Sequence, residues 1–210
     1  MQRGMFYPKR VPKFIDALFP QCLWRKADDA LYLTFDDSPS PYTLELLDLL
    51  AQHNAKATFF LIGKQIERYP DYAEAIVQQG HRIGNHSYSH TRNLQSPFFR
   101  DEVIQTAQLI AMLNPPEVAH PSLFRFPFGR FNFASLRILS ELNIQPIMWS
   151  LLTADFDASV SDKMVLNLLR SAIAGDIVVM HDNEKSIKKL RAVLPIALGE
   201  LSRRFSFNLL

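Results

Sequence analysis

The sequence from Ala30 to Pro41, ALYLTFDDSPSP, is an apolar run that ends in two adjacent aspartates at a proline-rich turn. This pattern is typical of a buried strand whose end carries the functional site of an α/β scaffold. The adjacent carboxylates belong to Asp36 and Asp37. Taken alone, Asp37 and Ser38 could merely start a turn or cap the next helix. The rest of the chain decides between this local role and a functional site.

The composition is that of an ordinary globular chain. Its 210 residues are 48% apolar and 21% charged, which is enough for one sizeable core and most simply a single domain. The net charge of +2 comes from Lys and Arg scattered along the chain, so we expect no nucleic-acid partner. No run approaches the roughly 18 apolar residues of a membrane span, which predicts no integral membrane segment. The oligomeric state is left open.

The first thirty residues are basic but carry no evident secretory signal, because Asp16, Pro20 and Gln21 interrupt any hydrophobic region. We therefore expect a cytoplasmic location, with action at the cell envelope or outside the cell as the alternative. The apolar side chains at Phe14, Ile15, Leu18 and Phe19 could form one face of a short helix, which more often packs as a lid than anchors a membrane.

Beyond this region, strand-like apolar runs alternate with segments of helical period. Repeated strand-then-helix order predicts a parallel sheet, and about seven such units suit a barrel better than a doubly wound sheet. Gly80 and Gly175 fall where two helices should stop. Strands are expected at 30–35, 57–62, 82–84, 123–126, 144–150 and 177–180, with a weaker pattern at 205–209, and helices at 43–53, 73–79, 97–113, 133–142, 163–174 and 184–201.

The carboxyl ends of parallel strands converge on one face of a barrel, so the residues at those ends should lie near one another. They are rich in types that serve catalysis. In chain order they are Asp36, Asp37, His86, His90, Arg125, Asp155 and His181.

His86 and His90 are four residues apart, a spacing that puts both rings on one face of a helical turn. Neutral imidazoles so placed can bind one transition metal, although surface histidine pairs also arise freely on helices. Asp37 would complete a set of two histidines and one aspartate that leaves coordination positions open for water and substrate. Asp36 would then stay free.

Arg125 begins the sequence RFPFG at another strand end. An arginine there is either a surface ion pair or the residue that orients a carboxylate such as Asp36 and holds it ionised. Pro127 and Gly129 predict an unusual backbone path. Such a path can present the Phe128 amide as an oxyanion donor.

Asp155 and His181 follow two further strands. A histidine at the end of a hydrophobic strand is often a satisfied core or loop residue. An aspartate that fixes its tautomer and raises its basicity would instead make His181 a candidate general acid.

Together these residues resemble the five ordered motifs of the polysaccharide deacetylase family, also known as the NodB homology domain or carbohydrate esterase family 4. The resemblance covers nearly all of 30–210 and implies a distorted (β/α)7 barrel in a single domain, with residues 1–29 as an N-terminal extension packed on the barrel. It also implies metal-dependent hydrolysis of acetyl groups from N-acetylated, or in some members O-acetylated, sugars such as chitin-type or peptidoglycan glycans. The motifs are TFDD at 34–37, HSYSH at 86–90, RFPFG at 125–129, Asp155-Phe156 and Val179-Met180-His181.

The resemblance also implies roles for single residues. The partner is expected to be an acetylated glycan, and the cofactor a divalent metal ion, Zn²⁺ first, with Co²⁺, Ni²⁺ or another transition metal as alternatives. Phe128 would act through its backbone amide. By position in the motifs, Asp36 resembles the general base, Asp37, His86 and His90 the metal ligands, Arg125 the residue that tethers the base, Asp155 the partner of the acid, and His181 the acid itself.

The chain also departs from the family pattern. Ser38 stands in place of the usual glycine, Phe128 of a tyrosine, Phe156 of a tryptophan and Val179 of a leucine. Because Phe156 and Val179 lie in the pocket expected to enclose the acetyl methyl group, the acyl specificity is left open.

Three other functions stay open at this stage: a metal-dependent amidase acting on a non-sugar linear or cyclic amide, a catalytically silent glycan-binding domain, and an iron oxygenase with two histidines and one carboxylate. The second aspartate beside Asp37 and the distant His181 suit hydrolysis better than oxygen chemistry.

Overall fold

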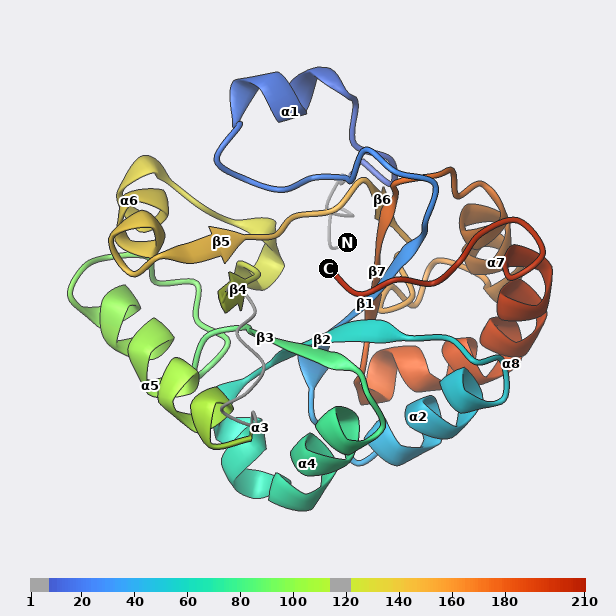
Figure 1. Cartoon of the computed structure of the whole chain (residues 1–210), viewed down its shortest axis with the longest axis horizontal. Coiled ribbons are helices and arrows are strands. Elements are labelled where there is room, and N and C mark those ends of the chain that lie inside the picture. Colours follow the sequence, from blue (N-terminus) through green and yellow to red (C-terminus); the bar gives the residue numbers. More distant parts are fainter. Residues whose placement is uncertain (1–7, 114–121) are drawn as a thin grey trace.

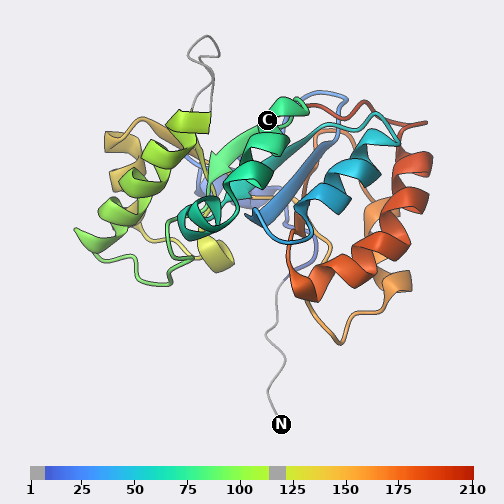
Figure 2. The same ribbon diagram turned by 90° about the horizontal axis from the view of Figure 1, so that it is seen from below.

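The computed structural model describes residues 8–113 and 122–210. Within these residues, seven parallel strands form one sheet that curls into an incomplete barrel, with the helices on its outer side (Figure 1). The strand order is β5-β4-β3-β2-β1-β7-β6, so β1 lies in the interior of the sheet. Figure 2 shows α5 and α6 (green to yellow) on one side of the strands and α7 and α8 (orange to red) on the other. The fold is the predicted distorted (β/α)7 barrel in a single domain.

The elements have the following bounds. The strands are β1 Tyr32–Ser38, β2 Ala57–Leu61, β3 Arg82–Asn85, β4 Ser122–Phe124, β5 Ile144–Pro146, β6 Leu151–Leu152 and β7 Ile177–His181. The helices are α1 Phe14–Leu18, α2 Thr43–Ala51, α3 Gly63–Arg68, α4 Pro70–Gln78, α5 Phe98–Leu113, α6 Phe133–Glu141, α7 Asp162–Arg170 and α8 Glu184–Leu201, with a 3-10 turn, η1, at Pro127–Gly129.

The predicted elements differ from the structure in three places. Of the strand expected over 144–150, only β5 forms, and it ends at Pro146; β6 follows just beyond the expected range and lies on the opposite edge of the sheet. The segment 205–209 makes only an isolated bridge, from Phe207 to Leu31. The short helix α3 escaped prediction because six residues cannot display a helical period.

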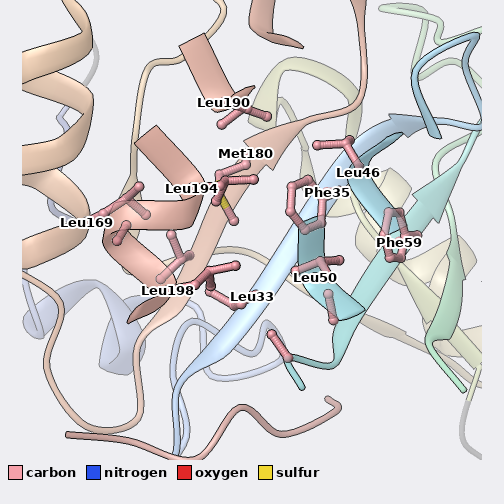
Figure 3. Close-up of a cluster of buried hydrophobic side chains, with 14 of the residues drawn as sticks. Leu33, Phe35, Leu46, Leu50, Phe59, Leu169, Met180, Leu190, Leu194 and Leu198 are labelled. Carbon is pink, nitrogen blue, oxygen red and sulfur yellow. The ribbon is translucent and has the colours of Figure 1, made fainter. Parts of the chain in front are cut away.

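Side-chain alternation along β1 separates the core from the barrel interior. Leu33 and Phe35 point outward and pack against leucines of α2 and α8 (Figure 3). Thr34 and Asp36 point to the opposite side, inside the barrel, because successive strand residues face opposite ways. In β7, the outward Met180 and the inward His181 repeat this division.

Residues 8–29 close the gap between the two edge strands, on the side of the barrel where α1 lies in Figure 1. Near β6, Val11 N donates to Ser150 O at 2.9 Å and Leu152 N donates to Lys9 O at 2.7 Å. Near β5, Leu23 N donates to Pro146 O at 2.9 Å. These bonds satisfy edge groups that would otherwise be open to pairing with another chain.

An ion pair and a close backbone contact hold the same segment. Arg10 binds the carboxylate of Asp176, with three nitrogen–oxygen contacts of 3.1 Å. Gly175 lies well beyond the end of α7 and therefore does not stop it, whereas Gly80 follows α4 directly with φ of 74°. A Cβ atom at Gly175 would lie 2.1 Å from the carbonyl oxygen of Lys26, so only glycine allows the segment to pass.

The boundary at residue 29 stays a prediction, and residues 1–7 of the predicted extension lie outside the described part of the chain. Among the helices that the structure describes, none combines the length and the hydropathy needed to cross a membrane.

Candidate active site

Arg125 holds Asp36 from inside the barrel. Nη1 of Arg125 donates to Oδ1 of Asp36 at 2.9 Å and to Oγ1 of Thr34 at 2.6 Å, and Nη2 donates to the carbonyl of Met148 at 2.9 Å. The guanidinium also lies 4.1 Å from the ring centroid of Phe60. Arg125 is fully buried, and these partners replace the water that it loses. Because Oδ1 of Asp36 is bound, its Oδ2 is the oxygen left for the pocket.

Asp37 breaks the alternation of β1, which would otherwise turn it away from Asp36. The pairing of β1 with β2 is irregular between Phe35 and Ser38, and Asp37 has φ of 71°. An irregularity of this kind re-aims a side chain next to a site. As a result, both adjacent carboxylates line the same pocket.

His86 and His90 meet Asp37 at this point. Their Nε2 atoms lie 3.7 Å and 3.3 Å from Oδ1 of Asp37. Nδ1 of His86 lies 2.8 Å from the carbonyl oxygen of Arg125. Since a carbonyl can only accept, Nδ1 carries the proton and Nε2 of His86 offers its lone pair to the cluster.

The donor set of Asp37, His86 and His90 fits a divalent transition metal. One ligand atom from each residue lies within 4.8 Å of the others. Oδ1 of Asp37 is buried and has no hydrogen-bond partner, which costs free energy unless a cation binds it. Two imidazoles and one carboxylate leave coordination positions open. Burial opposes ionisation of Asp37, but the neighbouring histidines hold its pKa below the ordinary value.

The two histidines converge without a helix, so the predicted helical turn was wrong. Ser87 and His90 have φ of 65° and 56°. Side chains from outside the loop hold this path: Oδ1 of Asn85 accepts from Ser87 N at 2.9 Å, and Glu102 of α5 accepts from N and Oγ of Ser89, each at 2.7 Å. Side chain to backbone bonds of this kind replace helical ones.

Asp155 and His181 form a second buried pair on the other side of the pocket. Nδ1 of His181 lies 3.0 Å from Oδ1 of Asp155, whose Oδ2 accepts from the backbone N of His181 at 2.8 Å. Burial lowers the pKa of His181, but the charge and hydrogen bond of Asp155, with smaller help from Asp37 and Asp36, raise it to about 9. For Asp155, burial raises the pKa, but the charge and hydrogen bonds of His181 outweigh burial, so the pKa is lowered overall. Because Nδ1 of His181 is bound to Asp155, its Nε2 is the atom left for the pocket.

The turn η1 has the unusual backbone path that the sequence predicted. Phe128 has φ of 59° and Gly129 has φ of 63°. A Cβ atom at Gly129 would lie 2.5 Å from the ring of Trp149, so this position requires glycine. The ring of Phe128 contacts His90, at a centroid distance of 4.4 Å, and the guanidinium of Arg92, which lies 4.0 Å from the ring centroid.

These groups surround a pocket of about 410 Å³. Asp36, Asp37 and Phe128 line it together with the three site histidines, whereas Arg125 and Asp155 lie fully buried behind it. One wall is apolar, as predicted for this part of the site, and consists of Trp149, Leu152, Phe156 and Val179. The structure therefore brings all eight predicted site residues to one place.

Sequence reasoning missed two residues that follow His181. Asp182 is buried and accepts hydrogen bonds from Ser40 Oγ and Thr43 Oγ1, each at 2.5 Å, and burial raises its pKa. Asn183 donates to Asp37 at 2.7 Å. An asparagine before a helical pattern signals an N-cap, but its contact with Asp37 follows only from the pairing of β1 with β7.

Comparison with known proteins gives consistent matches. Residues 25–147 match the family described as Polysaccharide deacetylase. A peptidoglycan-N-acetylglucosamine deacetylase of Bacillus cereus is 33% identical over 180 residues, which are 82% of this chain and 64% of that protein, so the chain spans less than two thirds of this relative. A chitooligosaccharide deacetylase of Azorhizobium caulinodans is 33% identical over 73% of each chain.

A solved structure shares the fold. It is a peptidoglycan N-acetylglucosamine deacetylase in complex with a substituted N-oxidanyl-benzamide, with a TM-score of 0.77 and 29% identity over 93% of this chain and 94% of that one.

Proposed function

Since this chain belongs to the polysaccharide deacetylase family, we propose that it is a metal-dependent hydrolase that removes acetyl groups from N-acetylated, or O-acetylated, sugars of a glycan. One observation carries this proposal: the unpartnered, buried Oδ1 of Asp37 faces His86 and His90 in the pocket that Asp36 and His181 also line.

Asp37, His86 and His90 would hold the ion, for which Zn²⁺, Co²⁺ or Ni²⁺ are suitable. When bound, such an ion supplies Lewis acidity, which polarises an acetyl carbonyl and lowers the pKa of water.

The remaining residues would move protons and hold charge. Asp36 would accept the proton of the attacking water through Oδ2, because Arg125 occupies Oδ1. The backbone amide of Phe128 would donate to the carbonyl oxygen as it becomes negative. His181, with its pKa raised to about 9, is protonated at neutral pH and would give the Nε2 proton to the departing amine. The products would be acetate and a free amino group on an N-acetylated sugar, or a free hydroxyl group on an O-acetylated one.

The relatives support an acetylated amino sugar as the substrate class, because they are named for peptidoglycan N-acetylglucosamine and for chitooligosaccharides. The apolar wall formed by residues such as Phe156 and Val179 suits the acetyl methyl group, and the aromatic side chains suit the face of a sugar ring.

The direct test is acetate release by protein stripped of metal and reloaded with Zn²⁺ or Co²⁺. Substrates are N-acetylglucosamine oligomers, peptidoglycan, an O-acetylated glycan and simple linear and cyclic amides. Metal-dependent release from a glycan supports the proposal. Hydrolysis of simple amides alone would establish the amidase alternative, glycan binding without release the silent domain, and oxygen consumption the oxygenase.

The cytoplasmic location expected from the sequence stays a prediction. Cell fractionation with an antibody against the chain tests it, and recovery of the protein in the envelope or medium would contradict it.

A further inference from the structure

Asn183 connects two parts of the site that are 146 residues apart in the sequence. Its Nδ2 donates to Oδ2 of Asp37 at 2.7 Å. Its Oδ1 accepts from the backbone N–H groups of Lys185 and Ser186, at 3.0 Å and 3.1 Å, and so caps α8. Only this orientation of the amide satisfies both ends, since a carboxylate accepts and a backbone N–H donates.

This contact makes the two oxygens of Asp37 different. Asn183 takes Oδ2, whereas Oδ1 is buried without a hydrogen-bond partner and lies 3.3 Å from Nε2 of His90 and 3.7 Å from Nε2 of His86. The two oxygens of a carboxylate are equivalent, so a half turn about the Cβ–Cγ bond restores the same arrangement, whereas any intermediate rotation would lose the Asn183 bond. The Asn183 amide therefore fixes the plane of the carboxylate and keeps one oxygen facing the imidazoles.

The position of Asn183 is fixed independently of Asp37. Asp36 and His181 are register partners in β1 and β7. The next residue, Asp182, donates its N–H to Asp36 O at 2.8 Å and accepts from Ser40 Oγ at 2.5 Å. On its other side, Asn183 is the N-cap of α8, whose leucines are buried in the outer core (Figure 3). A donor anchored on both sides can orient a carboxylate in advance.

We propose that Asn183 is a positioning residue for the metal site: it holds Asp37 so that Oδ1 and the two imidazoles are arranged before an ion binds. The proposal rests on the metal-dependent function proposed above and deepens it. Partners that orient ligands in this way commonly change metal affinity by about 10- to 100-fold when they are removed.

The variant Asn183→Ser tests this role. Serine keeps an oxygen that caps a helix and removes the amide donor to Asp37. We expect the Kd for Zn²⁺ to rise about 10- to 100-fold, measured by titrating the metal-free protein against a chromophoric chelator. The midpoint of thermal unfolding of the metal-free variant should change little. At saturating metal, kcat should return towards the wild-type value.

A matched control is available at another helix. Asn132 caps α6 in the same manner, accepting from Ser135 N at 2.7 Å, and does not line the pocket. Asn132→Ser should change stability as much as Asn183→Ser does, with no change in metal affinity. Asn183→Thr repeats the test with a second capping residue in case the serine variant does not fold.

The outcomes separate this inference from the function on which it rests. Wild-type protein that binds no metal would overturn both. Wild-type protein that binds metal no more tightly than the Asn183 variants would overturn the positioning role alone. An equal loss of affinity in Asn132→Ser would also overturn it, because the effect would then come from helix capping.

Discussion

Two buried ion pairs flank the pocket, Arg125 with Asp36 and His181 with Asp155, and they differ in whether the cation can lose its proton. The pairs have similar nitrogen–oxygen distances, 2.9 Å and 3.0 Å. Burial lowers the pKa of Arg125 while Asp36 raises it. A guanidinium nevertheless stays charged at every pH at which the protein is folded. Histidine titrates, and in this pair it does so near pH 9.

The difference indicates how one pocket can both accept and donate a proton. A permanent cation beside Asp36 favours a carboxylate that is ready to take a proton. A buried carboxylate beside His181 favours an imidazolium that is ready to give one. Amide hydrolysis requires both states at the same pH, and separate environments supply them.

The largest expected effect is on catalysis. Asparagine has the shape of aspartate but cannot accept the proton, so Asp36→Asn should lower kcat by roughly 10²- to 10⁴-fold and leave metal affinity nearly unchanged. Steady-state kinetics and metal titration measure the two quantities. Asp37→Ala is the matched variant and should lose the metal. If both variants bound metal equally well, the division of roles between the two aspartates would be wrong.

Removal of the permanent cation should cost stability. Arg125→Gln leaves Asp36 buried without its partner, which typically destabilises a protein by about 3–5 kcal/mol. Urea unfolding of the metal-free protein measures this loss. The control is Arg170→Gln, because Arg170 and Glu200 form a pair on the surface with side chains 45% and 41% exposed, where little change is expected. Similar losses in both variants would contradict the structural importance of the buried pair.

The titrating pair should instead make stability depend on pH. The pKa of His181 is raised from about 6.5 in the unfolded chain to about 9, so its contribution is complete below about pH 6.5 and is lost as the pH rises through about 9. At about 1.4 kcal/mol per pKa unit the loss is at most about 3.5 kcal/mol, and partial exposure of the ring reduces it.

The measurement is the unfolding free energy of metal-free protein from pH 6 to pH 10. Asp155→Asn should flatten the decline because it removes the carboxylate that raises the pKa of His181. Parallel declines in wild type and variant would assign the pH dependence to other groups.

The sequence predicted the parts of the site that depend on regular structure. The parallel order of the strands predicted that Asp36 and His181 would lie close together, and the two residues are register partners in β1 and β7. This prediction follows from the convergence of parallel strand ends, which requires only the strand-then-helix order that the sequence displays.

Apart from the path of η1, local backbone exceptions and long-range contacts could not be predicted. Asp37 at the end of β1, and Ser87, His90 and Ala154 in loops of the site, all have positive φ. Surrounding contacts maintain such conformations, and intrinsic preference does not favour them. The bond from Asn183 to Asp37 and the closing of the sheet edges by residues 8–29 likewise join segments whose proximity only the folded chain reveals.

The smallest expected effect comes from the threonine that accompanies each pair. The hydroxyl of Thr153 lies 2.8 Å from Oδ1 of Asp155, and its hydrogen bond lowers the pKa of that carboxyl group. Thr153→Val removes a donor that shares the negative charge of Asp155, so the carboxylate should act more strongly on His181 and move the alkaline limb of kcat/KM up by less than about one pH unit, in line with the loss of a single hydrogen bond. Thr34 accepts from Arg125 at 2.6 Å, and Thr34→Val should leave that limb in place because arginine does not titrate there. Profiles of kcat/KM from pH 6 to pH 10 compare the two variants, and an equal shift in both would mean that the alkaline limb does not report the His181 pair.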